Sequence, residues 1–398
     1  MNKHVPAGWQ VKTLEHCCDV LDSQRVPVNS IERSTRIGKY PYYGANGIQG
    51  YIDDYIFDDH LVLLAEDGGH FDEYATRPIC YMVKGKCWVN NHAHILKAKN
   101  NIYTELLHYS LVHKNILTFI NGGTRAKLNQ SDLLEIPILL PPLPEQRKIA
   151  AVLSSADRSI AATEKLIAKL ADLKKALMQQ LLTKGIGHTE FKPSPLGPIP
   201  KSWEVKLLTD VISKIIDCEH KTAPFIENGK YFVVRTNSIK DGQIIFEDAK
   251  YTHEEAFREW TQREIPQPGD VLFTREAPAG EAALVPEKLP LCLGQRMVLL
   301  KFNQDVNSAF FVYSLYGSEM RKCLNDMLIG TTVSRINMAD IKLINCLIPP
   351  ISEQRKIADI LNGVDRKLSA AKVKFAKAKD LKQGLMSDLL TGKVRVSA

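Results

Sequence analysis

Two loops combine small, hydroxyl and cationic residues in a pattern that could bind phosphates. Residues 122–132 read Gly-Gly-Thr-Arg-Ala-Lys-Leu-Asn-x-x-Asp, and residues 330–340 read Gly-Thr-Thr-Val-Ser-Arg-Ile-Asn-x-x-Asp. Small side chains allow close approach to a phosphate backbone, and hydroxyls and a cation supply the donors. The same pattern equally fits an Asx turn that caps a helix and holds no ligand. The candidate nucleic-acid contacts here are Thr124, Arg125, Lys127, Asn129, Thr332, Ser334, Arg335 and Asn337.

Further polar residues border apolar stretches that read as strands. Arg, Thr, Asn or Gln stands at the edge of each of the stretches 231–237, 269–275 and 294–300. Arg and Gln can bond two atoms of one base edge, although both are also common at strand ends. The Gly-, Tyr- and Asn-rich segment 40–51 reads as turns between short strands. These segments add the candidates Tyr42, Tyr43, Asn46, Gln49, Arg235, Thr236, Asn237, Arg275, Gln295 and Arg296.

Motifs that would indicate an enzyme or a metal centre are missing from the sequence. It has no Gly-x-x-x-x-Gly-Lys-Ser/Thr, Gly-x-Gly-x-x-Gly, Gly-x-Ser-x-Gly or His-Glu-x-x-His motif, and no Asn/Asp-Pro-Pro-aromatic motif of an amino-methyltransferase. Cys80, Cys87, His92 and His94 do not have the spacing of a standard zinc site, so we predict no metal. We therefore expect a chain that recognises a ligand and has no catalytic residues.

Composition and charge are those of an ordinary soluble chain. The 398 residues are 44% hydrophobic and 24% charged, which suits two or three domains. No leader and no apolar run as long as a membrane span is evident, and the eight cysteines form no C-x-x-C pair, so we expect a cytoplasmic protein with reduced thiols. The chain has a net charge of +7, and its basic excess lies in the segments 141–189 and 341–398, whereas the remaining segments are slightly acidic. A lysine-rich helix surface is usually only solvated, so this charge does not by itself establish nucleic-acid binding.

A repeated segment supplies the elements that must position the candidate residues. The pattern Pro-Pro-x-x-Glu-Gln-Arg-Lys-Ile-Ala occurs at 141–150 and again at 349–358. After each copy, apolar residues recur at steps of four and three, beginning at Ile149 and at Ile357. This heptad seam predicts two long helices, the first over 145–182, that pack on each other. The simplest alternative is a pair of core helices in a repeat protein.

Both predicted helices share an interruption of the seam. The regular step falls on Lys174 in the first helix and on Lys382 in the second. We expect the apolar seam to continue one residue earlier in each helix, at Leu173 and Leu381.

A globular domain precedes each predicted helix. Both domains open with Pro-x-x-Trp-x-Val-Lys-x-Leu, at 6–14 and at 200–208, but their central segments do not resemble each other. In the first domain, the segments 60–65, 88–89 and 94–96 read as strands, and 104–120 has helical spacing. Seven Gly or Pro residues within 185–200 indicate a linker.

This order of parts resembles the specificity subunit of bacterial type I restriction-modification enzymes. The resemblance rests on the paired Pro-Pro-x-x-Glu-Gln-Arg motifs, on Leu-Leu-Thr-Lys-Gly at 181–185 and on Tyr-Gly-Ala-Asn-Gly at 43–47, and it covers essentially the whole chain. It implies an α+β fold with a pseudo-two-fold internal repeat and two antiparallel helices. The implied parts are a first target recognition domain over 1–140, a spacer helix over 141–184, a linker over 185–200, a second recognition domain over 201–348 and a second spacer helix over 349–392.

The resemblance also implies a function. Each recognition domain would read one half of an asymmetric, bipartite site on double-stranded DNA, and the helices would space the domains and dock two methyltransferase subunits. No cofactor is expected on this chain, whereas partner subunits would use S-adenosylmethionine, ATP and Mg²⁺; two restriction or motor subunits are further expected partners. The implied subunit contacts are Glu145, Gln146, Arg147, Glu353, Gln354 and Arg355.

Three alternatives are open at this point. A protein-interaction scaffold would have the same helices but no salt-dependent DNA affinity. An enzyme such as a fused methyltransferase would need the cofactor motifs that the sequence lacks. A specificity chain that serves methylation only, without a nuclease partner, would have the same sequence features.

Overall fold

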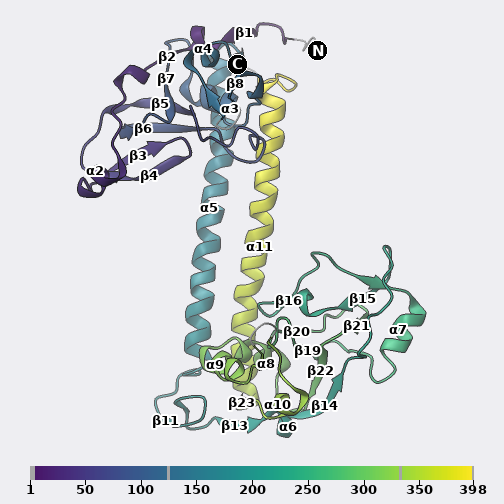
Figure 1. The fold of residues 1–398 in the computed structure, drawn as a ribbon. Helices are drawn as coiled ribbons and strands as arrows, with labels where there is room; N and C mark the ends of the chain where they lie inside the picture. The colour runs from purple at the N-terminus through teal and green to yellow at the C-terminus, as the bar shows by residue number, and fades with distance from the viewer. Residues whose placement is uncertain (1–4, 123–125, 331–333, 397–398) are drawn as a thin grey trace. The chain divides into compact units, whose positions relative to one another are not determined.

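The computed structural model describes residues 5–122, 126–330 and 334–396. The chain forms two compact units, one of residues 1–165 with 373–398 and one of residues 166–372. Each unit contains one globular domain and a part of each of two long helices, α5 (Leu143–Leu181) and α11 (Ile351–Leu390) (Figure 1). Each unit therefore contains the start of one long helix and the end of the other, and the first unit combines the two ends of the chain. The predicted α+β class with two long helices is confirmed.

The heptad seam forms the contact between the helices inside each unit. In the first unit, Ile149 and Leu153 of α5 are buried in one cluster with Leu389 of α11. In the second unit, Ile357 and Leu361 of α11 are buried with Leu181 of α5. Residues near the start of one helix thus meet residues near the end of the other, which is antiparallel packing.

The predicted continuation of the seam at Leu173 and Leu381 is wrong. These side chains are 46% and 62% exposed. The regular step is kept instead by Lys174 and Lys382, whose ammonium groups form ion pairs with Asp365 and Asp157. A lysine can hold such an inward position because its stem packs while its charge is neutralised by a carboxylate.

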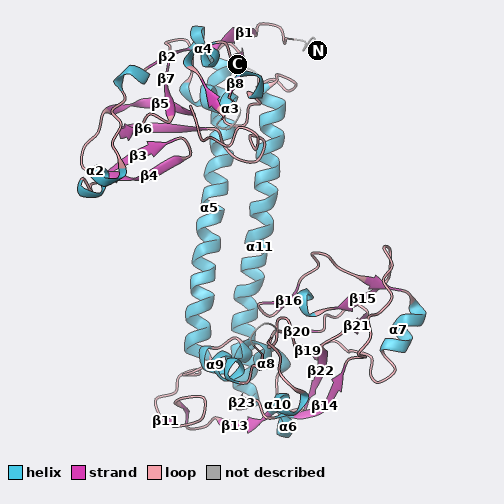
Figure 2. Cartoon of the chain, in the orientation of Figure 1, coloured by secondary structure: helices cyan, strands magenta, loops and turns pink. Residues whose placement is uncertain are grey.

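The first domain is built on a six-stranded sheet with the order β2-β7-β5-β6-β3-β4 (Figure 2). Its predicted strands are present, and the segment rich in Gly and Tyr forms the hairpin β3–β4. Helix α3 covers β5 and β6, and it is shorter than the helical spacing suggested because a turn and a 3-10 helix follow it. The main elements are β2 (Cys18–Val20), β3 (Tyr40–Gly44), β4 (Gly47–Ile52), β5 (Phe57–Ala65), β6 (Cys80–Val89), β7 (Ala93–Ala98) and α3 (Thr104–Leu111).

The second domain contains a four-stranded sheet with the order β14-β22-β19-β20. All neighbours in it are antiparallel, as they are in the β2-β7-β5-β6 part of the first domain. The two domains therefore share a core topology, although their central sequences do not match. Its main elements are β14 (Ile212–Asp217), β19 (Val271–Thr274), β20 (Ala282–Leu284), β22 (Met297–Phe302) and α8 (Ser308–Leu315).

Each domain is closed by an antiparallel pair of strands from its two ends. β1 (Gln10–Thr13) pairs with β10 (Pro137–Leu140), and β13 (Glu204–Leu207) pairs with β23 (Asn345–Ile348). These pairs place the Pro-x-x-Trp opening of each domain beside the first turn of the helix that follows the domain.

The second domain has additional elements outside the shared core. A three-stranded sheet has the order β18-β15-β21, and its strand β15 runs parallel to β21. The additional elements are β15 (Tyr231–Val234), β16 (Ile239–Lys240), β17 (Gln243–Ile244), β18 (Tyr251–Thr252), β21 (Leu291–Leu293), α7 (Glu254–Trp260) and α9 (Ser318–Asp326).

Within the described ranges, no helix is both long and apolar enough to cross a membrane.

Candidate nucleic-acid interface

The glutamate of the repeated motif binds the tryptophan of the domain opening. Glu145 Oε2 accepts a hydrogen bond of 3.0 Å from Trp9 Nε1, and Glu353 Oε2 accepts one of 3.0 Å from Trp203 Nε1. Each carboxylate has a second partner that follows the opposite helix in the chain. Arg395 donates to Glu145 at 2.7 and 2.8 Å, and His188 Nε2 lies 2.9 Å from Glu353. The Arg395 guanidinium, with help from the Trp9 indole, holds the pKa of Glu145 below its usual value.

The glutamine of the motif connects each long helix to a domain helix. Gln146 Oε1 accepts a 2.8 Å bond from the backbone N–H of Tyr103, just before α3, and its Nε2 donates to Pro141 O at 2.9 Å. Gln354 makes the same contacts with the N–H of Asn307, just before α8, and with Pro349 O, both at 2.8 Å. Such bonds satisfy donors and acceptors that the adjoining helix ends leave open.

These contacts correct the predicted role of four motif residues. Glu145, Gln146 and Gln354 are buried, and the Glu353 side chain is 12% exposed. Their polar atoms are bonded inside their own unit, so they are not available as contacts to another subunit. Arg147 and Arg355 are exposed, and their proposed contact with a partner subunit stays a prediction.

A second repeated contact joins each domain to both long helices. The Tyr109 hydroxyl donates to Asp157 Oδ2 at 2.7 Å, and Lys382 Nζ lies 2.6 Å from Asp157 Oδ1. In the second unit, Tyr313 donates to Asp365 Oδ2 at 2.7 Å and Lys174 Nζ lies 2.7 Å from Asp365 Oδ1. We call each set the Tyr-Asp-Lys clamp. Burial and the adjacent carboxylate raise the pKa of both tyrosines, which keeps each hydroxyl a donor.

The two loops that were predicted to bind phosphate, at 122–132 and 330–340, share several contacts where the structure describes them. The backbone N–H of Leu128 donates to Glu66 O, and that of Ile336 donates to Arg275 O, both at 2.8 Å. Asn129 bonds Asp132, and Asn337 bonds Asp340, both at 3.2 Å. The exposed asparagines occupy the N-cap positions of α4 (Gln130–Leu134) and α10 (Met338–Lys342), but neither side chain makes a capping hydrogen bond. Whether these turns bind phosphate stays a prediction.

The remaining loop candidates differ in their surroundings. Lys127 is half exposed, and its Nζ lies 3.2 Å from Glu66 Oε1. Arg335 is exposed, Ser334 is partly exposed, and the backbone of Arg335 pairs with Ile329. Thr124, Arg125 and Thr332 lie outside the described residues.

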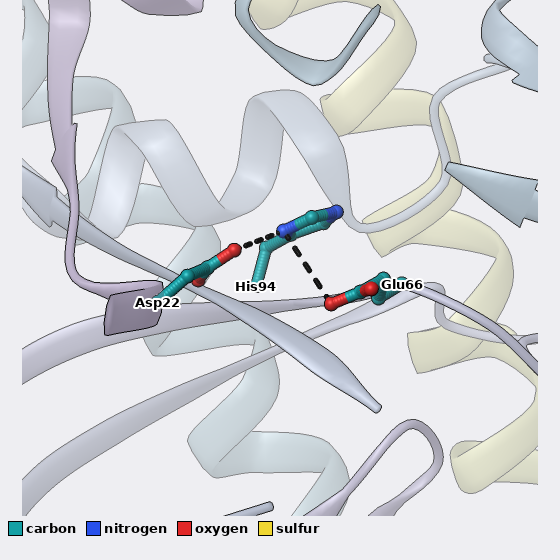
Figure 3. A group of neighbouring side chains, drawn as sticks. All are labelled: Asp22, Glu66 and His94. Carbon is teal, nitrogen blue, oxygen red and sulfur yellow. Dashed lines mark hydrogen bonds and ion pairs between the residues drawn. The ribbon is translucent and has the colours of Figure 1, made fainter. Parts of the chain in front are cut away.

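An ion-pair cluster holds the base of the first loop (Figure 3). His94 Nδ1 lies 2.5 Å from Asp22 and 3.9 Å from Glu66, and its Nε2 lies 2.9 Å from Leu128 O. Arg25 contacts Glu66 at 2.5 Å. The side chains of Asp22, Glu66 and His94 lie close enough together to hold a metal ion. However, Arg25 and Lys127 already neutralise Glu66 and both ring nitrogens of His94 face acceptors, so we interpret the group as an ion-pair cluster.

The four candidate residues of the β3–β4 hairpin differ in how far their side chains are exposed. Tyr42 is 1% exposed and its hydroxyl donates to Val28 O at 3.1 Å, so its predicted contact with DNA is wrong: the side chain is part of the core. Tyr43 is half-buried. Asn46 and Gln49 are exposed, and Asn46 Nδ2 donates to Gly68 O at 3.0 Å. Asn46 and Gln49 are therefore at the surface of the hairpin, and their contact with DNA stays a prediction.

In the second domain, five candidates line one cavity of about 390 Å³. They follow the end of β15 and lie between β21 and β22, so they come from two segments that are about sixty residues apart in the sequence. Other loop residues also line the cavity. No motif or periodicity in the sequence indicated them as candidates. The five candidates are Arg235, Thr236, Asn237, Gln295 and Arg296, and the additional residues include Thr222, Phe225 and Ala277.

Arg275 is separate from this group of cavity residues. Its Nη1 donates to both oxygens of Asp217, at 3.0 and 2.9 Å. Nη1 of Arg275 is thereby bonded inside the protein, at the end of β14. A contact between Arg275 and DNA stays a prediction.

The family model described as "Type I restriction modification DNA specificity domain" matches residues 6–172 and again residues 200–375. The chain belongs to this family. The specificity subunit is similar over nearly its whole length to curated relatives. It is 28% identical to the putative type I restriction enzyme MjaX specificity subunit of Methanocaldococcus jannaschii, over 98% of this chain and 95% of the relative. It is 26% identical to the putative specificity subunit S.HindORF215P of Haemophilus influenzae, over 88% and 86%.

A solved structure has the same fold. The specificity subunit matches the S subunit of a type I restriction-modification system from M. genitalium with a TM-score of 0.68, over 98% of this chain and 97% of the other, at 15% sequence identity. Proteins of this family are non-catalytic specificity subunits, so the predicted absence of an enzymatic role agrees with the family.

Proposed function

We propose that this specificity subunit binds double-stranded DNA and that each globular domain reads one half of an asymmetric, bipartite site. The observation that carries this proposal is the repeat of one loop geometry in two domains with different polar surroundings. The Leu128–Glu66 and Ile336–Arg275 bonds place equivalent turns in both domains. A shared turn suits a contact with phosphates, which are the same at every sequence, and the differing side chains suit contacts with different bases.

The residues that remain exposed form the proposed DNA surface. In the first domain they are Asn46, Gln49, Lys127 and Asn129, with Tyr43 partly exposed. In the second they are Asn237, Gln295, Arg296, Arg335 and Asn337, with Arg235, Thr236 and Ser334 partly exposed. Thr124, Arg125 and Thr332 belong to the same proposal on sequence grounds alone.

The helices are proposed to set the spacing between the half-sites and to dock two methyltransferase subunits. The repeat supports two equivalent docking sites, because each unit has its own motif, its own clamp and one exposed arginine, Arg147 or Arg355. The partners would bring S-adenosylmethionine, and restriction or motor subunits would bring ATP and Mg²⁺.

Sequencing of methylated bases in the host, with and without this gene, tests the proposal directly. A bipartite motif that loses methylation with the gene supports it. If no motif changes, and if the purified chain with its partner shows no salt-dependent DNA affinity, the chain is a protein scaffold and the proposal fails. A motif that is methylated but never cleaved in unmethylated DNA would identify a methylation-only system.

A further inference from the structure

Arg296 has an unusual backbone conformation for its residue type. Its φ is +69°, in the left-handed region that is unfavourable for residues other than glycine. Two contacts hold this conformation: the Arg296 N–H lies 3.1 Å from Cys218 Sγ, and Arg296 O accepts a 2.9 Å bond from the Arg275 N–H. A glycine would fit this turn better, so stability does not explain the arginine. Residues held in such conformations are concentrated at functional sites.

The Arg296 side chain is held in place but its outer end is open. Its Nε lies 3.2 Å from Glu276 Oε2, and the side chain is 50% exposed. Among the described residues, neither Nη atom of Arg296 has a hydrogen-bond partner. An arginine fixed at Nε presents two parallel N–H groups outward, and this geometry fits the O6 and N7 acceptors of guanine in the major groove.

In each of the other two arginines of this region, one Nη atom is already bonded inside the protein. Arg275 Nη1 donates to both carboxylate oxygens of Asp217, and Arg235 Nη2 donates to the carboxylate and the backbone O of Asp248. Their side chains are 23% and 27% exposed. Arg296 shares the cavity with Asn237 and Gln295, whose exposed amides can bond neighbouring base edges.

We propose that Arg296 reads a guanine in the half-site of the second domain and that Glu276 is its positioning residue. This assignment rests on the proposed function. It separates a base contact at Arg296 from the phosphate contacts proposed for the loop at Arg335.

The test uses the complex reconstituted with the methyltransferase partner and duplexes that contain the methylated motif. The variants are Arg296→Gly, which removes the side chain and relieves the backbone, and Arg296→Lys, which keeps the charge but not the paired donors. Arg258→Ala is the matched control, because it removes one exposed cation from the same domain. Each complex is measured on duplexes with each base pair at every guanine of the second half-site, and with 7-deazaguanine, which lacks N7.

Arg296→Gly is expected to melt no lower than wild type and to lose discrimination at one guanine by about tenfold to a hundredfold. Arg296→Lys should lose most of the same discrimination, and Arg258→Ala none. The 7-deazaguanine duplex should weaken wild type but not Arg296→Gly. Glu276→Ala should reduce the discrimination, and Glu276→Gln, which keeps an acceptor for Nε, should restore much of it.

Three results would overturn the assignment while leaving the proposed function intact. One is unchanged base preference in Arg296→Gly. Another is a loss that is equal for all sequences with a shallower salt dependence, which is the behaviour of a phosphate contact. The third is a second half-site without guanine. A wild-type complex that marks no bipartite sequence would instead refute the proposed function, and the assignment with it.

Discussion

Lys174 of α5 forms an ion pair with Asp365 of α11, with 2.7 Å between Nζ and Oδ1. The same pair recurs 208 positions away with the helices exchanged, as Asp157 of α5 with Lys382 of α11. Each aspartate also accepts the hydroxyl of a tyrosine from its own domain. One carboxylate therefore fixes both the register of the antiparallel helices and the attachment of a domain to them.

The clamp should contribute unequally in the two units. Asp365 is 15% exposed and Asp157 is 40% exposed. Asp365→Asn is therefore expected to lower the free energy of unfolding by about 1–3 kcal/mol, because it breaks a charged contact that water screens poorly. Asp157→Asn should cost less. Denaturant melts measure both, and Asp359→Asn, at an exposed position of α11, is the control. Equal costs at the two sites would contradict this account.

Glu145 should make stability depend on pH in the acid range. Its pKa in the folded chain is lowered, chiefly by Arg395, so its contribution is complete above the unfolded-state pKa of about 4.3. The contribution disappears as the pH falls through the lower, folded-state value. Glu145→Gln should therefore melt below wild type at pH 6–7, and the difference should shrink below about pH 4. A difference that stays constant over this range would show that the charge is unimportant.

Lys127 and Arg335 are expected to contact phosphates. Lys127→Ala and Arg335→Ala should each weaken binding to all sequences by a similar factor and reduce the slope of affinity against salt by about 1. Binding titrations at several salt concentrations measure this, with the exposed Lys201, just after the linker, as a control site. A changed base preference in either variant would mean that the loop reads sequence.

A chain that ends near Gly187 should pair with itself and read a palindromic site. Asp157 of one copy would meet Lys174 of the partner copy, since Lys174 is the repeat counterpart of Lys382. With the methyltransferase present, methylation should appear at an inverted repeat of the first half-site. Lys174→Ala in the truncated chain removes both clamps at once and should shift it toward monomer in sedimentation. A truncated complex that marks only the original site would refute the pairing.

The length of the helix pair should set the spacing between the half-sites. An insertion near Thr183–Lys184 would not lengthen the helix, because α5 ends at Leu181 and the Ile186 N–H that follows is bonded to Glu353. Seven residues inserted in both helices, between the clamp residues, preserve the heptad seam and add roughly 10 Å, or about three base pairs. The methylated motif should gain that spacer, with DNA twist absorbing the difference in rotation. An active variant with an unchanged spacer would exclude this role.

Much of this protein follows from its sequence alone. The steps of four and three from Ile149 and Ile357 predict the long helices, because periodicity depends only on the geometry of a helix. The paired Pro-Pro-x-x-Glu-Gln-Arg motifs indicate the family. The absence of nucleotide and methyltransferase motifs indicates a chain that recognises its target, since those chemistries need specific residues at specific spacing.

Other features were decided only by the tertiary structure. Glu145 and Gln146 are polar residues that suggested a surface contact, but they are buried because Trp9, Arg395 and the start of α3 supply their partners from distant parts of the chain. Lys174 keeps the seam that an apolar pattern assigned to Leu173, because Asp365 neutralises it. Tyr42 turns inward by the alternation of β3. Arg296 and Arg275 look alike in sequence, but Arg275 bonds a carboxylate through Nη1 whereas Arg296 contacts one through Nε. Partners from remote segments determine these outcomes, and local sequence patterns do not contain them.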